Sequence, residues 1–205
     1  MHPLTVTIST TLAACLLPGC ASPTPPVVQQ FGGMREVMRE GHTEPRIRLR
    51  DAVARPHALA IGALEGLHGE VTIVDGDVWV SRVADNQLQV TGPNLASGDQ
   101  ATLLSLTNVE KWQSVAIENP AEGAELESLI QRAAAESGIE ATKPFPFMIE
   151  GESAGIDLHV INGYCPIAVD PSTVDAKPWY WSSERSPHAV IVGFHALKSP
   201  ASRTL

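Results

Sequence analysis

The stretch that decides the fold runs from Ala58 to Val80 and reads ALAIGALEGLHGEVTIVDGDVWV. Its second half contains two runs rich in β-branched residues, Glu70–Val74 and Asp77–Arg82, on either side of Asp75-Gly76. An Asp-Gly pair between two such runs is the strongest short-range signal of a β-hairpin, because both residues tolerate the positive φ angles of a tight turn. The sequence therefore predicts a hairpin here and strands from His57 onward.

Outside this stretch, strands dominate the predicted structure. Two short helices are expected first, at Met34–Glu40 and Arg48–Ala54, and one long helix later, with Asn119 as its N-cap, Pro120 in its first position and Gly138 at its end. The further predicted strands are Ala101–Thr107, Gln113–Glu118, Pro144–Ile149, Ile156–Ile161 and His188–His195. Residues 162–187 look irregular, and their aromatic run Trp179–Trp181 is expected to be a loop pinned onto the core. Local hairpins with one long packing helix indicate an α+β fold with a mixed or antiparallel sheet.

The composition supports a folded domain and excludes one class of partner. Apolar residues make up 43% of the 205 residues and charged residues 18%, which is enough to build a core. The formal net charge is −9, and there is no tract of Lys and Arg. Because nucleic-acid binding relies on clustered cationic side chains, we expect no nucleic-acid partner.

The N-terminal 20 residues are predicted to be an export signal. An apolar stretch, Leu4–Pro18, ends at Leu17-Pro18-Gly19-Cys20, which resembles a bacterial lipoprotein cleavage site, and Cys15 is an alternative. We therefore expect lipidation at Cys20, a cell-envelope or periplasmic location and a lipid anchor in the membrane. Residues 21–44 then form a linker with a short helix, and 45–205 form the domain. Cys165 is expected to be a small buried residue.

Three motifs, in order, resemble the α-acetolactate decarboxylase family. The family's G-T-F-N-x-L-D-G-E motif is similar to Gly62–Glu70, its F-Y-A-I-R-I-D-G strand to Phe145–Gly151, and its G-T-I-V-G-F strand to Ala189–Phe194. The resemblance covers most of residues 45–205. It implies that family's fold and its metal-dependent reaction, in which 2-acetolactate, a 2-hydroxy-2-methyl-3-oxo acid, becomes acetoin and CO2.

The resemblance also indicates which residues carry the chemistry. In the family, three histidines bind a zinc ion, which acts as a Lewis acid, while carboxylates and an arginine position the substrate. Glu70 matches the motif glutamate and is the candidate catalytic residue retained. The motif threonine is replaced by Ala63, and the strand arginine by Met148. The H-x-H pair is expected beyond Leu205, so we expect an incomplete site, a domain truncated at its C-terminal end, and no zinc bound by this chain.

The sequence offers one alternative metal site. Asp157 and His159 are two residues apart on a predicted strand and would share a face, and His188 opens a later strand. One carboxylate and two imidazoles are an acceptable ligand set for iron or zinc. The more frequent reason for such residues is a surface pair, and His195 should lie on the opposite face from His188.

Two functions from different classes remain open. The first is an α-acetolactate decarboxylase-like lyase with an incomplete active site, and the second is a non-catalytic envelope lipoprotein that binds a small ligand or a partner protein. The predicted strand that ends near His195 would become an exposed sheet edge if the domain is truncated. Such an edge favours association, so a homo-oligomer is possible.

Overall fold

The structure, a computed structural model, describes residues 4–9, 26–94, 98–117, 125–153, 156–164, 178–183 and 186–196. The chain divides into two compact units, each assembled from separate stretches. Unit 1 consists of Met1–Val28, Val109–Ala154 and Arg185–Leu205, and unit 2 of Gln29–Asn108 and Gly155–Glu184. In the described part of the chain, no helix has the length and apolar character needed to span a bilayer. The sequence-based divisions at residues 20 and 44 stay predictions.

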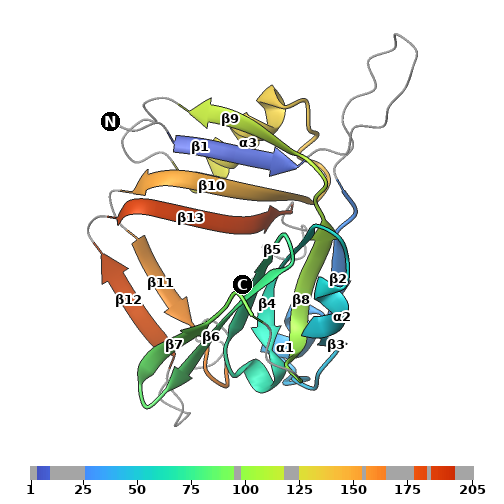
Figure 1. Cartoon of the computed structure of the whole chain (residues 1–205), viewed down its shortest axis with the longest axis vertical. Coiled ribbons are helices and arrows are strands. Elements are labelled where there is room, and N and C mark those ends of the chain that lie inside the picture. Colours follow the sequence, from blue (N-terminus) through green and yellow to red (C-terminus); the bar gives the residue numbers. More distant parts are fainter. Residues whose placement is uncertain are drawn as a thin grey trace. The chain divides into compact units, whose positions relative to one another are not determined.

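Unit 2 is built on a seven-stranded antiparallel sheet (Figure 1). Six strands follow the order β2 (Gln29–Phe31), β8 (Gln100–Asn108), β4 (Ala58–Leu64), β5 (Glu70–Val74), β6 (Asp77–Ala84) and β7 (Gln87–Thr91), and β3 (Ile47–Arg48) also pairs with β8. From β4 to β7 each strand pairs with the next one in sequence. The short helices α1 (Met34–Met38) and α2 (Leu49–Val53) confirm both predictions.

The predicted hairpin is confirmed. Asp75 and Gly76 have φ angles of 51° and 87°, and Val74 pairs with Asp77 directly across the turn. Side chains along β5 alternate between buried and half-buried, as expected for a strand with one face on the core. The same turn chemistry recurs at Asp85-Asn86, where φ is 52° and 59°, and it adds β7, a strand not predicted from the sequence.

A separate two-stranded ribbon completes unit 2. It pairs β11 (Ile156–Val160) with β12 (Trp179–Ser183) in an antiparallel register that sets His159 opposite Tyr180. The prediction of an irregular loop at Trp179–Trp181, pinned onto the core, is therefore wrong. Tyr180 is 62% exposed and Trp181 is 41% exposed. These neighbouring residues point to opposite faces of the ribbon, and a two-stranded ribbon has no second layer of its own to cover either face.

Unit 1 contains a four-stranded antiparallel sheet in the order β13 (Ser186–His195), β10 (Phe145–Ser153), β1 (Leu4–Ser9) and β9 (Trp112–Ile117). Figure 1 shows β1 between β9 and β10. Among the described strands, β13 forms one edge of this sheet. β1 lies inside the expected export signal, and export itself stays a prediction. Cys15, Cys20 and Cys165 lie outside the described residues.

One long helix, α3 (Leu126–Glu136), belongs to unit 1 and buries Ile130, Ala133 and Ala134 in a cluster with Ile117 and Phe145. α3 begins at Leu126, and its N-cap Glu125 has extended backbone angles. The predicted start at Asn119 and Pro120 lies outside the described residues.

The predicted end of α3 is confirmed. Gly138 has a φ of +70°, and the N–H of Ile139 donates to the carbonyl of Ala134 at 2.8 Å. This left-handed residue and the bond that follows it are typical of a glycine-capped helix end.

Candidate functional site

The candidate site begins at the turn between β4 and β5, which we call the motif turn (Glu65–Gly69). Gly66, Leu67 and Gly69 have φ angles of +67°, +59° and +117°. A side chain at Gly69 would meet the carbonyl oxygen of Ser81 at 2.3 Å, so this position requires glycine. Leu67 is not a glycine, and its left-handed backbone costs roughly 1–2 kcal/mol. That cost is offset by its side chain, which is only 3% exposed within a cluster that includes Ile161.

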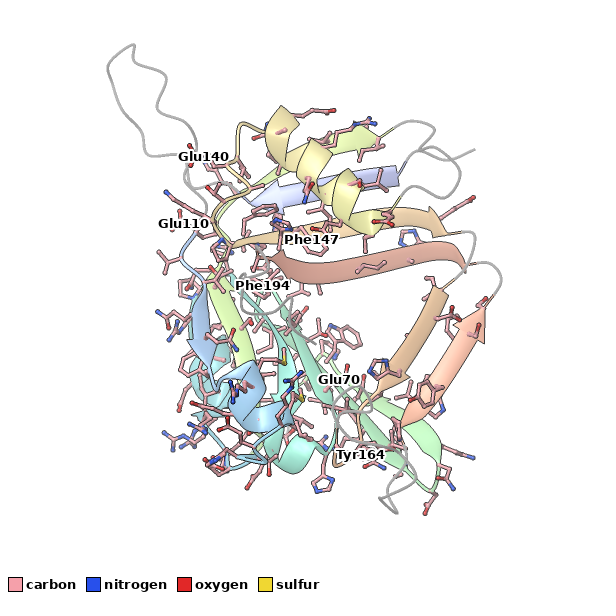
Figure 2. All side chains as sticks on the ribbon, turned by 180° about the vertical axis from the view of Figure 1, so that it is seen from behind. Glu70, Glu110, Glu140, Phe147, Tyr164 and Phe194 are labelled. Atoms are coloured by element: carbon pink, nitrogen blue, oxygen red, sulfur yellow. The ribbon has the colours of Figure 1, made fainter. Side chains whose placement is uncertain are left out.

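Two hydrogen bonds attach the motif turn to the segment that follows β11. The N–H of Gly163 donates to the carbonyl of Leu67 at 2.8 Å. The N–H of Ile161 donates to Oε1 of Glu70 at 3.1 Å. Glu70 is the first residue of β5, in register with Ala63 and Ser81, and it is half-buried (Figure 2). The motif glutamate is therefore held in place by backbone groups from a distant part of the chain.

The surroundings of Glu70 change its acidity. Burial beside the apolar cluster of Leu67 and Ile161 raises the pKa of the Glu70 carboxyl above its ordinary value of 4.5, and the Ile161 N–H and the charge of His159 lower it by less. A carboxyl group with a raised pKa keeps its proton closer to neutral pH. Glu70 can therefore donate a proton or a hydrogen bond to an anionic ligand.

The face of the ribbon that carries His159 is polar, and residues of both faces border a hollow. Asp157, His159, Tyr180 and Ser182 share this face by strand alternation and register. Ser182 donates a hydrogen bond to Asp157, and the rings of His159 and Tyr180 lie 5.9 Å apart. These four residues, with Leu158 and Trp181, line a hollow of about 450 Å³. A hollow of this size is sufficient for a small organic ligand.

Tyr164 adds an unsatisfied polar group to unit 2. Its side chain is 5% exposed, and among the described residues its Oη has no hydrogen-bond partner. Burying a hydroxyl without a partner costs free energy, so such a group in a folded protein calls for an explanation. Tyr164 directly follows Gly163, whose N–H donates a hydrogen bond to Leu67 in the motif turn. Tyr164 and Glu70 can both be located in Figure 2. Sequence reasoning missed Tyr164, because a tyrosine in an irregular segment carries no distinguishing pattern.

The alternative metal site draws on both units and stays a prediction. Asp157 and His159 share a face of the ribbon in unit 2, and His188 belongs to unit 1, where its Nε2 lies 3.7 Å from Oε1 of Glu150. Across the described ranges, no group of three His, Cys, Asp or Glu residues could hold a metal ion. The expectation that this chain binds no zinc stays a prediction. His195 is buried against Phe145, with ring centroids 4.8 Å apart, whereas His188 is exposed.

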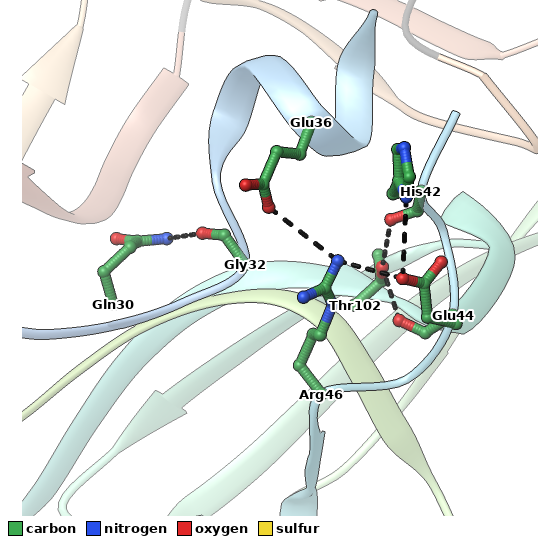
Figure 3. A network of polar contacts seen from close by, with 7 residues as sticks. All are labelled: Gln30, Gly32, Glu36, His42, Glu44, Arg46 and Thr102. Carbon is green, nitrogen blue, oxygen red and sulfur yellow. Dashed lines mark hydrogen bonds and ion pairs between the residues drawn. The ribbon is translucent and has the colours of Figure 1, made fainter. Parts of the chain in front are cut away.

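Two arginines of unit 2, Arg46 and Arg82, already have acidic partners. Arg46 lies 3.0 Å from Glu44 and 3.8 Å from Glu36 (Figure 3). In the same network, the buried Thr102 hydroxyl donates to the carbonyl of Glu44 at 3.0 Å, which fixes the segment before β3 onto β8. This network is structural.

Arg82 also has a partner, Asp99, at 2.7 Å. Both residues line a second hollow, of about 430 Å³, beside the motif turn. Arg82 follows Ser81, the strand partner of Glu70, so its side chain points to the face of the sheet opposite Glu70. Met148, which replaces the family's arginine, is in β10 of unit 1, and a thioether cannot pair with a carboxylate.

No family model and no curated protein matches the sequence. The structure is similar to that of a Staphylococcus aureus protein of unknown function that is itself similar to α-acetolactate decarboxylase. The two are 15% identical with a TM-score of 0.58, over 82% of this chain and 67% of that one. It is also similar to α-acetolactate decarboxylase from Bacillus subtilis strain 168, with 15% identity and a TM-score of 0.56, over 86% of this chain and 69% of that one. The chain therefore has the α+β fold of α-acetolactate decarboxylase-like proteins, with mostly antiparallel sheet and few helices, as the three motifs predicted.

Proposed function

We propose that this chain is a divergent α-acetolactate decarboxylase-like protein that binds a small 2-hydroxy-3-oxo acid beside Glu70 without decarboxylating it. The family reaction converts 2-acetolactate to acetoin and CO2 with a divalent metal. The observation that carries the proposal is the environment of Glu70, which keeps the motif position, the backbone anchor from Ile161 and a raised pKa. Loss of the motif threonine and arginine argues against turnover.

The chemistry proposed for Glu70 uses this chain's own residues. A protonated Glu70 donates a hydrogen bond to the ligand's carboxylate or oxo group, and the His159 side chain supplies a second polar group from the ribbon. Ionised Glu70 would instead repel a carboxylate ligand. Binding should therefore weaken as pH rises through the raised pKa of Glu70.

The binding test uses 2,3-dihydroxy-2-methylbutanoate, a stable analogue, titrated calorimetrically into the full chain between pH 4.5 and 8. We expect affinity to fall at least tenfold as pH rises in the wild type. Glu70→Gln should bind with little pH dependence, because an amide is uncharged throughout. Glu65→Gln, an exposed residue of the same motif turn, is the matched control and should behave like the wild type. An unchanged pH dependence in Glu70→Gln would contradict the proposal.

Turnover is tested separately by CO2 release from 2-acetolactate, with zinc added. We expect no release above the spontaneous rate. Release at an enzyme-like rate that Glu70→Gln abolishes would instead establish a lyase.

The second candidate, a non-catalytic envelope lipoprotein, is favoured by Met148 at the arginine position and by the export signal expected from the sequence. Radiolabelled fatty acid incorporated at Cys20 in a bacterial host, and lost in Cys20→Ser, would support it.

A further inference from the structure

The middle strand of the unit 1 sheet comes from the N-terminal end of the chain. β1 pairs with β10 from Thr5 opposite Glu150 to Ile8 opposite Phe147, and with β9 from Leu4 opposite Ile117 to Ser9 opposite Trp112. β9 and β10 are joined in this sheet through β1, as Figure 1 shows. Without β1, both neighbours would present unpaired backbone groups toward each other across a gap one strand wide. We call this gap the acceptor slot.

The sequence of β1 matches the slot. Its apolar residues Leu4, Val6 and Ile8 alternate with Thr5, Thr7 and Ser9, which is the period of a strand with one apolar face. The register sets Val6 opposite Ile149 and Val115, and Ile8 opposite Phe147. Ile149, Val115 and Phe147 belong to the apolar cluster that α3 covers. Because a shift of one residue exchanges the two faces of a strand, the alternation in this sequence specifies a register.

No short turn ties β1 to its own sheet. The chain leaves β1 through residues 10–28 and enters β2, which belongs to unit 2, and the sheet neighbours β9 and β10 follow only after Asn108. A connector of that length spans up to about 60 Å when extended. The connector is therefore long enough for β1 to enter the acceptor slot of another molecule. There β1 would make the same strand pairs as in its own molecule. Exchange of identical elements between copies creates dimers at low cost for this reason.

We propose that the acceptor slot is a strand-exchange site, and that its partner is β1 of a second copy of this chain. Two copies exchange β1 reciprocally, so that each sheet keeps the order β13-β10-β1-β9 with a strand from the other molecule. Backbone hydrogen bonds along both sides of β1 supply the affinity, and the alternation of Leu4–Ser9 supplies the specificity. The exchange concerns chains that keep residues 1–20, and it does not rest on the function proposed for Glu70.

Disulfide trapping of the full chain tests two points separately: that β1 occupies the acceptor slot, and that β1 exchanges between copies. In a background where Cys15, Cys20 and Cys165 are replaced by Ser, Thr5→Cys and Ala116→Cys stand directly opposite each other. A chain that carries both should form this disulfide on mild oxidation, within one chain in the monomer and between two chains in the exchanged dimer, because facing strand residues meet the distance requirement. Thr5→Cys with Gln113→Cys is the matched control, since Gln113 is also exposed on β9 but faces Ile8.

The exchange itself is tested with two single-cysteine chains, one carrying Thr5→Cys and one carrying Ala116→Cys. After mixing at about 1 mM, we expect a covalent heterodimer at a yield at least tenfold above that with Gln113→Cys. Light scattering of the wild type should show a dimer that grows between 1 µM and 1 mM, and Val6→Asp should abolish it. An intrachain disulfide without any heterodimer, or a chain that stays monomeric throughout this range, would overturn the exchange. Failure of Thr5→Cys and Ala116→Cys to form a disulfide either within a chain or between two chains would overturn the acceptor slot.

Discussion

The two units of this protein build antiparallel sheets in opposite ways. In unit 2, β4 to β7 follow one another along the chain and are joined by turns such as Asp75-Gly76 and Asp85-Asn86. In unit 1, each strand comes from a different part of the chain, so that Leu4–Ser9 pairs with Trp112–Ile117 on one side and Phe145–Ser153 on the other. Local pairing closes short loops, whereas distant pairing must first overcome the entropy of long ones.

This difference indicates where each sheet is vulnerable. A sheet made of hairpins keeps most of its contacts when one distant segment is lost. The unit 1 sheet depends on a strand that enters from the N-terminal end, and the retained Glu70 lies in the hairpin-built unit. We therefore expect the two units to respond separately to substitutions, with unit 1 the more sensitive.

The largest effects should come from the two cores. Phe145 in unit 1 and Leu104 in unit 2 are both fully buried. Truncation to Ala should cost about 3–5 kcal/mol for Phe145 and about 2–5 kcal/mol for Leu104, because each leaves a cavity. Hydrogen exchange followed by mass spectrometry should show faster exchange in β9 and β10 for Phe145→Ala, and in β4 and β8 for Leu104→Ala. Loss of protection in both units from either variant would remove the distinction between them.

Next in size is a charge placed in the central strand of unit 1. Val6→Asp puts a carboxylate at the register position between Ile149 and Val115, and should cost about 3 kcal/mol. The same substitution at Val90, 54% exposed on the edge strand β7, should cost less than about 0.5 kcal/mol. Urea unfolding measures both. Equal costs would mean that β1 adds nothing to the sheet.

The contrast between the units also explains which strands could be predicted from the sequence. The hairpin around Asp75-Gly76 is encoded by adjacent residues, so its turn and both strands are visible in the sequence. β1 has an equally regular alternation, but an apolar N-terminal segment that ends near Cys20 also fits an export signal. Nothing local in Leu4–Ser9 points to partners more than 100 positions away. β12 was missed for the same reason, since its partner is β11.

A smaller effect is expected at the turn of the hairpin. Gly76 has a φ of +87°, and a side chain there would meet nothing within 4 Å, so backbone strain alone decides the cost. Gly76→Ala should lower the free energy of unfolding by about 1 kcal/mol. Gly76→Asn should lower it less, because asparagine tolerates this conformation. Thermal unfolding of the two variants measures the difference, and an equal loss would point to a cause other than φ.

The smallest effect concerns the charge of Glu70. Its raised pKa means that the folded state holds this proton more tightly than the unfolded state. The stabilisation is therefore full below the ordinary value of 4.5 and is lost as pH rises through the folded pKa. Relative to the wild type, Glu70→Gln should gain stability between pH 4.5 and pH 7, by up to about 1 kcal/mol for this partly exposed group. Urea unfolding at both pH values checks this. A constant difference would contradict the raised pKa.

The candidate site was only partly visible in the sequence. Glu70 could be identified from its motif. The turn before it needs glycine at Gly66 and Gly69 for positive φ angles, and both residues stand close to Glu70 in the sequence. The hydrogen bond from the Ile161 N–H could not be identified from the sequence. Its donor is a backbone group 91 residues away, which any residue except proline would provide. The exposed face around His159 follows from the pairing of β11 with β12, and the segment before Tyr164 is placed by the bond from Gly163 to Leu67. Neither contact carries a local signal in the sequence.

The anchor of Glu70 has a consequence for how a ligand would be sensed. One carboxylate oxygen accepts the Ile161 N–H, and Ile161 follows directly on the last residue of β11. A ligand that competes for this oxygen loosens the attachment of the ribbon to the motif turn. Thermodynamic linkage requires the reverse as well, so that any restraint on the ribbon changes the affinity of such a ligand by the same factor. In the proposed site, Glu70 would therefore link ligand binding to the attachment of β11 at the motif turn.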